Sequence, residues 1–211
     1  GSQSKVFTNY VDGDTTSFTT YNGFYNVKVR YLAVDTPEST SEIEEWGKSA
    51  SKFNKSKLSA AKHVIVQSAG CARTGKTAVA DLDGYQRSLA YVWYSDVENP
   101  TQNDFRNLNL ELVQEGYSIF SGSREDMVEF ETVDGVAVVK DDSFYNAFVA
   151  ANDQAKALKK HIYSDEKDPN YYYGAPKKLT LDALYDTSLY DLEADFKGKK
   201  VKYSAYCDEF T

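Results

Sequence analysis

The stretch VRYLAVDTPE, residues 29–38, has the pattern of a strand followed by a charged turn. Apolar side chains alternate with Arg30 and Leu32, which is the two-residue period of a strand with one buried face. Beyond the strand come Asp35 and, across a proline turn, Glu38. We therefore expect this segment to lead from a buried strand into a loop that carries chemistry.

Two further stretches carry charged residues of the same kind. Asp12-Gly13 marks a tight turn with Asp14 just after it, and DGYQRSLAYV at residues 83–92 leads from a second turn into an apolar strand. Asp14 and Asp35 can share one hard cation through oxygen ligands. Arg30 and Arg87 can fork onto a phosphate.

Metal-assisted hydrolysis of a phosphodiester needs a cation, positively charged groups beside the phosphate and a base that acts on water. Glu38 is placed to be that base. Each residue also has a plain structural reading. Aspartates are common in turns beside glycine and proline, and either arginine could form a surface salt bridge. The combination of all five in three stretches favours the chemical interpretation.

The three stretches resemble the signatures of the staphylococcal nuclease (thermonuclease) family. Those signatures are a V-x-D-G-D-T turn, an R-L-x-x-V-D-T-P-E strand-to-loop run and a Y-x-R-x-L-A-Y-V strand, and they occur here in the family's order. The resemblance runs from about Val6 to Ser164. It implies an α+β fold, a five-stranded OB-fold β-barrel with three packed helices, to which this chain adds an inserted hairpin and a C-terminal extension.

The chain's own patterns place the elements of that fold. Residues 89–94 are apolar on both faces, which predicts a central strand. Helices are expected over residues 42–62, after a cap at Asp104 with a stop at Gly116, and after a cap at Ser143. The last helix carries one apolar stripe, made of Phe144, Phe148, Ala151, Ala155, Leu158 and Ile162.

Asp134-Gly135 between two apolar runs predicts the inserted hairpin. The predicted boundaries are residues 5–164 for the nuclease-like domain and 165–211 for the extension. This extension, with a possible short helix near Leu181–Tyr185 and a strand-like Lys200–Tyr206, either packs back on the barrel or begins a truncated further domain.

By resemblance, Asp14, Asp35 and the backbone carbonyl of Thr36 bind Ca²⁺. Glu38 activates or positions the attacking water, while Arg30 and Arg87 neutralise the developing charge. Tyr85 stacks on or hydrogen-bonds the nucleotide, or else is merely a hairpin aromatic. The implied activity is calcium-dependent hydrolysis of DNA and RNA that leaves 3′-phosphates, by a monomer.

The alternative function is a catalytically weak nucleic-acid-binding domain on the same fold. A formal net charge of −8 argues against general attraction to nucleic acid, although a bound cation and two arginines can make one pocket positive. The sequence also departs from the family pattern. Glu42, Glu44 and Glu45 stand in the loop where lysines are expected, and Gln86 replaces a glycine before Arg87.

A competing motif occurs at residues 70–77, GCARTGKT, which satisfies the phosphate-binding P-loop pattern G-x-x-x-x-G-K-T. A P-loop needs a following helix whose N-terminus faces the phosphates. Here residues 78–82 run directly into the Asp83-Gly84 turn, so we expect a connection between two strands instead.

The two cysteines, Cys71 and Cys207, are either unrelated thiols or one disulfide, and the sequence leaves both open. With only two histidines and no Cys-x-x-Cys pair, a zinc site is not expected. No signal peptide is visible. A secreted or cell-surface setting is expected from the resemblance, with any signal removed from the Gly1-Ser2 start.

Overall fold

The computed structural model describes residues 8–19, 26–40, 42–70, 81–173, 190–196 and 199–204. The chain divides into two compact units, Gly1–Tyr171 and Tyr172–Thr211. The first unit therefore continues past residue 164, where the sequence placed the end of the domain.

In the second unit, β11 (Tyr190–Phe196) pairs antiparallel with β12 (Lys199–Ser204), which overlaps the strand expected at residues 200–206. The possible helix at 181–185, both cysteines and P-loop positions 71–77 lie outside the described residues.

The first unit is built on a mixed sheet with the strand order β1-β2-β3-β6-β5, and β7 pairs with β6 off this path. The strand bounds are β1 Thr8–Tyr10, β2 Thr15–Thr19, β3 Asn26–Tyr31, β5 His63–Ser68, β6 Ser88–Ser95 and β7 Arg106–Asn107. The β3–β6 pair is parallel, whereas the others are antiparallel. The predicted central strand is confirmed, because β6 has partners on both sides and buries Ala90, Val92 and Tyr94.

The expected closed five-stranded barrel is not among the strand pairings of the described residues. There the sheet path is open, with the three-residue β1 at one edge and β5 at the other. What the structure establishes is a mixed α+β fold whose sheet is covered by helices.

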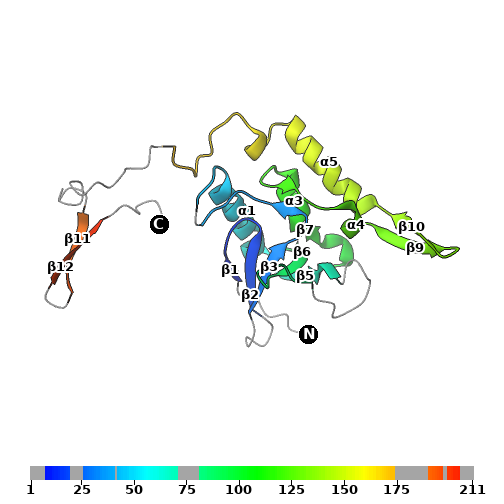
Figure 1. The fold of residues 1–211 in the computed structure, drawn as a ribbon, viewed down its shortest axis with the longest axis horizontal. Helices are drawn as coiled ribbons and strands as arrows, with labels where there is room; N and C mark the ends of the chain where they lie inside the picture. The colour runs from blue at the N-terminus through cyan, green and yellow to red at the C-terminus, as the bar shows by residue number, and fades with distance from the viewer. Residues whose placement is uncertain are drawn as a thin grey trace. The chain divides into compact units, whose positions relative to one another are not determined.

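Four α-helices occur in the described residues: α1 Gly47–Ala60, α3 Leu108–Gln114, α4 Arg124–Met127 and α5 Ser143–Ala157. Helix α3 contacts β6 and α5, while α1 contacts α3 and β1 (Figure 1). The core between sheet and helices is formed by buried side chains such as Val29, Tyr31, Val92, Leu108, Leu112, Val113 and Phe148. None of the helices among these residues combines the length and apolarity that crossing a bilayer would require.

Helix α3, the second of the helices predicted from the sequence, begins later than predicted. Asp104 closes the short 3₁₀ turn η1 (Gln102–Asp104) through a capping box with Thr101, so it does not cap α3. The cap of α3 is Asn107, whose Oδ1 accepts the Leu110 N–H at 2.8 Å. Gly116 ends this helix as predicted, with φ of +68°.

Helix α5, the third of the helices predicted from the sequence, buries much of its predicted apolar stripe. Phe148, Ala151 and Ala155 are buried, but Leu158 is 60% exposed, which corrects its assignment to the core. Leu158 is the C-cap of α5, and Lys159 follows with a φ of 49°, so the chain leaves the helix there. Ser143 is the first helical residue and not the cap, since Asp142 occupies the N-cap position.

The inserted hairpin is confirmed as β9 (Glu129–Val133) and β10 (Val136–Asp141). Asp134 and Gly135 both have positive φ, 50° and 79°, as a tight hairpin turn requires. Every residue of both strands is exposed, and the hairpin extends away beyond α4 (Figure 1). It therefore adds surface to the unit and almost nothing to its core.

Candidate active site

Asp14 lies at the end of the first turn, directly before β2, and is only 5% exposed. Its backbone carbonyl accepts the Tyr31 N–H at 2.8 Å, which ties the turn to the end of β3. A Cβ on Gly13 would come within 2.7 Å of Thr36 Oγ1 and 2.8 Å of the Ala50 Cβ. Glycine is needed here because the turn packs directly on the strand-to-loop segment and on α1.

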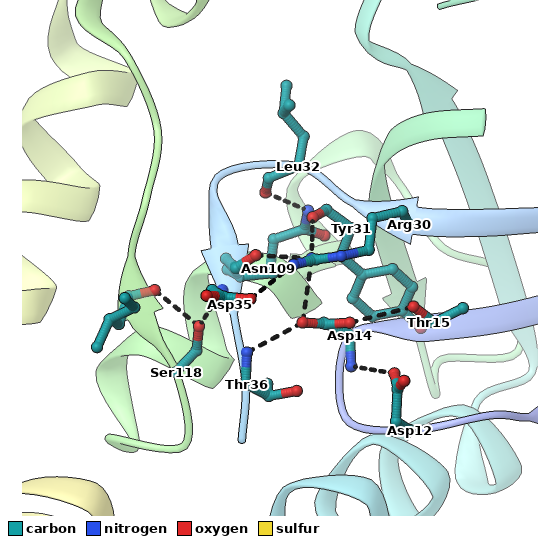
Figure 2. A network of polar contacts seen from close by, with 12 residues as sticks. Asp12, Asp14, Thr15, Arg30, Tyr31, Leu32, Asp35, Thr36, Asn109 and Ser118 are labelled. Carbon is teal, nitrogen blue, oxygen red and sulfur yellow. Dashed lines mark hydrogen bonds and ion pairs between the residues drawn. The ribbon is translucent and has the colours of Figure 1, made fainter. Parts of the chain in front are cut away.

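Arg30 on β3 bridges the two aspartates of the candidate metal site (Figure 2). Its Nη1 lies 3.0 Å from Asp14 Oδ2, and its Nη2 lies 2.9 Å from Asp35 Oδ1. The same Nη1 is 2.7 Å from the Val34 carbonyl oxygen. These contacts fix the guanidinium and bring together carboxylates that are 21 positions apart in the sequence.

Asp35 and Thr36 are placed by a short strand pair. β4 (Val34–Asp35) pairs antiparallel with β8 (Ile119–Phe120), and the Asp35 N–H donates to Ser118 Oγ at 2.8 Å. The Thr36 N–H donates to Asp14 Oδ2 at 2.9 Å, so the two halves of the site share a hydrogen bond (Figure 2). Asp14 is thereby held from two sides, whereas the Asp35 side chain remains 59% exposed.

The pKa of Asp14 is raised from 3.8 to about 6. Burial is the main cause, because it penalises the charged carboxylate, and the Arg30 guanidinium and the Thr36 N–H oppose it. One arginine shared between two carboxylates leaves the cluster one negative charge in excess. A divalent cation would turn that excess into one positive charge, which suits a phosphate.

The residues present fit Ca²⁺ by their chemistry. Asp14, Asp35 and the Thr36 carbonyl offer hard oxygen ligands, the kind that Ca²⁺ binds, and leave coordination positions for water and a phosphate oxygen. In the described part of the chain no cluster of three or more His, Cys, Asp or Glu side chains is arranged for a metal. The candidate set is thus two carboxylates and a main-chain oxygen.

Glu38 lies in the loop that leads from β4 to α1, and its side chain is exposed. Its N–H donates to Glu44 Oε2, and its carbonyl accepts the Glu44 N–H, both at 2.9 Å. Among the described residues, its carboxylate has no hydrogen-bond or ion-pair partner. The backbone is therefore held while the side chain stays available as a base. Glu44, one of the unexpected acids of this loop, closes the loop on Glu38.

Arg87 is held in the turn before β6. Its Nε lies 2.6 Å from Asp83 Oδ2, and Asp83 Oδ1 accepts the N–H groups of Tyr85 and Arg87. Within the described residues the two terminal nitrogens of Arg87 have no hydrogen-bond partner. The guanidinium also lies 5.5 Å from the Tyr85 ring centroid, and Tyr85 is 84% exposed.

The structure brings Asp14, Arg30, Asp35 and Thr36 into direct contact. Arg87, Tyr85 and the Glu38 carboxylate make no hydrogen bond or ion pair with that cluster in the described residues. The parallel register pairs Val29 with Ser88 and Arg30 with Leu89, and Arg87 directly precedes Ser88 in the chain.

Sequence reasoning missed the residues that hold these groups in place. Asp83 could have been found from its spacing of four residues to Arg87 in the turn. Ser118 and Asn109 had no local signal; the Asn109 side chain accepts the Val92 N–H and donates to the Leu32 carbonyl, both at 2.9 Å.

Comparison with known proteins identifies a family. No curated protein matches the chain. The family model described as staphylococcal nuclease homologue matches residues 28–165, which include Arg30, Asp35, Thr36, Glu38 and Arg87 but not Asp14. That match covers more than half of the chain and contains both the strand-to-loop segment and the turn that precedes β6. A chain matched over this length, with these charged residues inside the match, belongs to the staphylococcal nuclease homologue family.

Proposed function

We propose that this protein is a calcium-dependent nuclease that hydrolyses phosphodiester bonds of DNA and RNA without preference for the sugar. The single observation that carries the proposal is the pairing of Asp14 and Asp35 on one guanidinium, with the Thr36 N–H on Asp14. Family membership supplies the nuclease class, and the residues supply the chemistry.

In this mechanism Asp14, Asp35 and the Thr36 carbonyl would hold Ca²⁺, which would supply Lewis-acid polarisation and positive charge at the phosphate. Glu38 takes or orients a proton of the attacking water. Arg87, anchored through Nε by Asp83, directs its two terminal nitrogens at the phosphate oxygens, where bidentate hydrogen bonds stabilise the extra charge of the transition state. Tyr85, exposed beside Arg87, stacks on the nucleotide. The products carry 3′-phosphates.

The resemblance to the staphylococcal nuclease family also implies a barrel fold and a location outside the cell. The strand order β1-β2-β3-β6-β5 with a parallel β3–β6 pair supports an OB-type sheet, and we infer that it closes as a five-stranded barrel. A secreted or cell-surface monomer suits an enzyme that depends on millimolar calcium.

The test is cleavage of single-stranded DNA and of RNA while Ca²⁺ is titrated against a chelator. Cleavage is expected to rise with Ca²⁺ and to stop on chelation. Asp35→Asn serves as the matched variant, because Asp35 is exposed and its loss spares the core; it should need more Ca²⁺ for half-maximal rate. Full activity in excess chelator would contradict the proposal.

The second candidate is a nucleic-acid-binding domain with little activity. The observation that favours it is the acidic loop, in which exposed Glu42 and Glu44 repel phosphate near Glu38. Binding of single-stranded DNA without cleavage at saturating Ca²⁺ would support this candidate over the enzyme.

A further inference from the structure

A cavity of about 190 Å³ opens at the base of the β9–β10 hairpin, away from the candidate active site. Its lining includes Gln67 on β5, Tyr91 and Trp93 on β6, Asp126 on α4, Glu129 and Asp141 at the two ends of the hairpin, and Phe144 at the start of α5. Figure 1 shows α4, the hairpin and the start of α5 meeting here. The inserted hairpin therefore contributes a wall to a cavity that the proposed reaction does not use.

Aromatic rings line this cavity in a fixed arrangement. Tyr91 and Phe144 meet edge to face, with centroids 5.0 Å apart at 81°, and Trp93 lies 6.3 Å from Phe144 at 21°. The Trp93 Nε1–H donates to Gln67 Oε1 at 2.9 Å, which locks the indole. Aromatic faces attract cations, and a planar guanidinium also stacks on them.

Among the described residues that line the cavity, the ionisable groups other than tyrosine are all acids. Glu129 and Asp141 are register partners across the hairpin base, and Asp126 is the third. Glu129 is paired with exposed Lys140 at 3.1 Å, Asp141 Oδ1 accepts the Ser143 N–H, and Asp126 Oδ2 accepts the Ser123 hydroxyl. In the part of the chain that the structure describes, no Lys, Arg or His lines the cavity. Such a site attracts a cation and repels a phosphate, so nucleic acid is not its occupant.

The Tyr91 hydroxyl is a second, independent sign of a ligand. Tyr91 is 2% exposed, and its Oη has no hydrogen-bond partner among the described residues. Burial and the nearby Asp126 carboxylate raise the pKa of Tyr91, so the hydroxyl stays protonated. Buried hydroxyls are normally paired. Tyr91 lines the cavity, so an N–H group that displaced the side chains covering its buried oxygen would complete the hydroxyl, because a hydroxyl oxygen accepts such a bond.

We propose that this cavity binds the guanidinium group of an arginine side chain presented by a partner protein. The volume is below that of typical small-molecule pockets, about 300–1,000 Å³, and suits the head of one side chain. Beside the cavity the hairpin exposes the register partners Phe130 and Val139, an apolar pair that fits a polypeptide. The cavity recognises the charge, and the hairpin contacts the residues that flank it.

Calorimetric titration of the full chain tests this directly. The probe is a capped five-residue peptide with a central arginine between valines, and its control carries citrulline, which has the same shape without the charge. The arginine peptide is expected to bind at least about tenfold more tightly, as a desolvated cation–π contact of about 1.4 kcal/mol or more implies. Equal binding of the two peptides, or binding of neither, overturns the proposal.

Variants assign the binding to the cavity. Tyr91→Phe and Asp126→Asn should each lower the affinity for the arginine peptide by about fivefold, because each removes one hydrogen bond or charge contact. Glu98→Gln, which removes an exposed acid paired with Lys62 elsewhere, should change nothing. If Glu98→Gln weakens binding as much as Asp126→Asn, the attraction is general charge and the site is wrong. Methylguanidinium alone must bind more weakly than the peptide; equal affinity would exclude a protein partner.

Folding of the key variant can be checked separately. Tyr91→Phe removes an unpartnered hydroxyl, so its melting temperature should equal or exceed that of the parent. Tyr94→Phe is the matched control, because the Tyr94 hydroxyl donates to Glu111 Oε2 at 2.5 Å and its loss should destabilise. A Tyr91→Phe protein that melts as early as Tyr94→Phe would show that the hydroxyl already has a partner, and the proposal would lose its second support.

Discussion

Asp14 is the residue in which burial and charge conflict most directly. It is 5% exposed, it shares Arg30 with Asp35, and its pKa is raised to about 6 chiefly by burial. A protein that needed Asp14 only for stability would be better served by a neutral side chain. The conflict is resolved if the charged form is kept for a cation.

Asp14→Asn should therefore stabilise the protein in chelator above pH 6. A folded-state pKa above the ordinary 3.8 means that the Asp14 contribution to stability is complete below pH 3.8 and is lost as the pH rises to about 6. The gain from Asn should grow across that window, to about 1–3 kcal/mol. Urea unfolding of both proteins from pH 4 to 8 measures it. A gain that does not change with pH would contradict the raised pKa.

Glu38 and Arg87 belong to the proposed chemistry and contribute little to the core. Glu38→Gln and Arg87→Ala should each lower turnover by roughly 10²-fold or more, the usual scale for losing a base or a charge stabiliser. Steady-state cleavage assays measure this, with circular dichroism as the control for folding. Two folded variants with rates within a few-fold of the parent would refute the roles given to these residues.

At the scale of elements, the loop between β4 and α1 positions Glu38, the proposed base. The loop closes through the paired backbone and side-chain bonds of Glu38 and Glu44, and α1 starts directly against it. A Cβ on Gly47 would lie 2.0 Å from the Glu38 carbonyl oxygen and 2.6 Å from its carbonyl carbon. The helix can approach Glu38 this closely only because residue 47 has no side chain.

Gly47→Ala should consequently displace the Glu38 backbone. We expect turnover to fall by at least about tenfold, since a shift of about 1 Å in a catalytic group can cost more than that. Gly84→Ala is the matched control, because a Cβ there meets nothing within 4 Å. Thermal melting and cleavage rates of both variants provide the comparison; equal behaviour would exclude a positioning role for the close contact.

At the scale of the molecule, residues 166–171, which follow the family match, are part of the first unit. Asp168 is 2% exposed, and its carboxylate accepts the Trp46 N–H at 2.9 Å and the Ser49 hydroxyl at 2.6 Å. Asn170 adds a bond to Ser49 Oγ at 2.7 Å. The segment that follows α5 thus fastens the start of α1, next to the loop that carries Glu38.

Ending the chain after Tyr171 should leave folding and cleavage near the level of the full chain. Ending it after Ser164 removes Asp168 and leaves the buried Trp46 N–H unpaired, a cost of about 1–3 kcal/mol. Asp168→Ala should reproduce this loss within the full chain. Melting temperatures and cleavage rates of the three proteins decide the matter. A stable, active chain that ends at Ser164 would show that the contact is dispensable.

Part of this protein follows from its sequence alone. Backbone stereochemistry and alternation over a few residues determined the Asp134-Gly135 turn, the central strand β6 and the helix end at Gly116. The charged motifs named the candidate residues, and their order indicated the family later matched over residues 28–165. Such features depend on neighbours within one turn or one strand, so the local pattern contains the information.

Only the tertiary structure decided which groups meet. The hydrogen bond from the Trp46 N–H to Asp168 joins residues 122 positions apart in the sequence, and the bond from the Asp35 N–H to Ser118 joins residues 83 positions apart. Leu158 looked like core from its spacing, yet it lies exposed because the chain turns away at Lys159. Contacts of this kind arise from packing of distant segments, and no pattern within a segment records them. For the same reason, the sequence offered two aspartates and an arginine, but only the fold placed both carboxylates on Arg30.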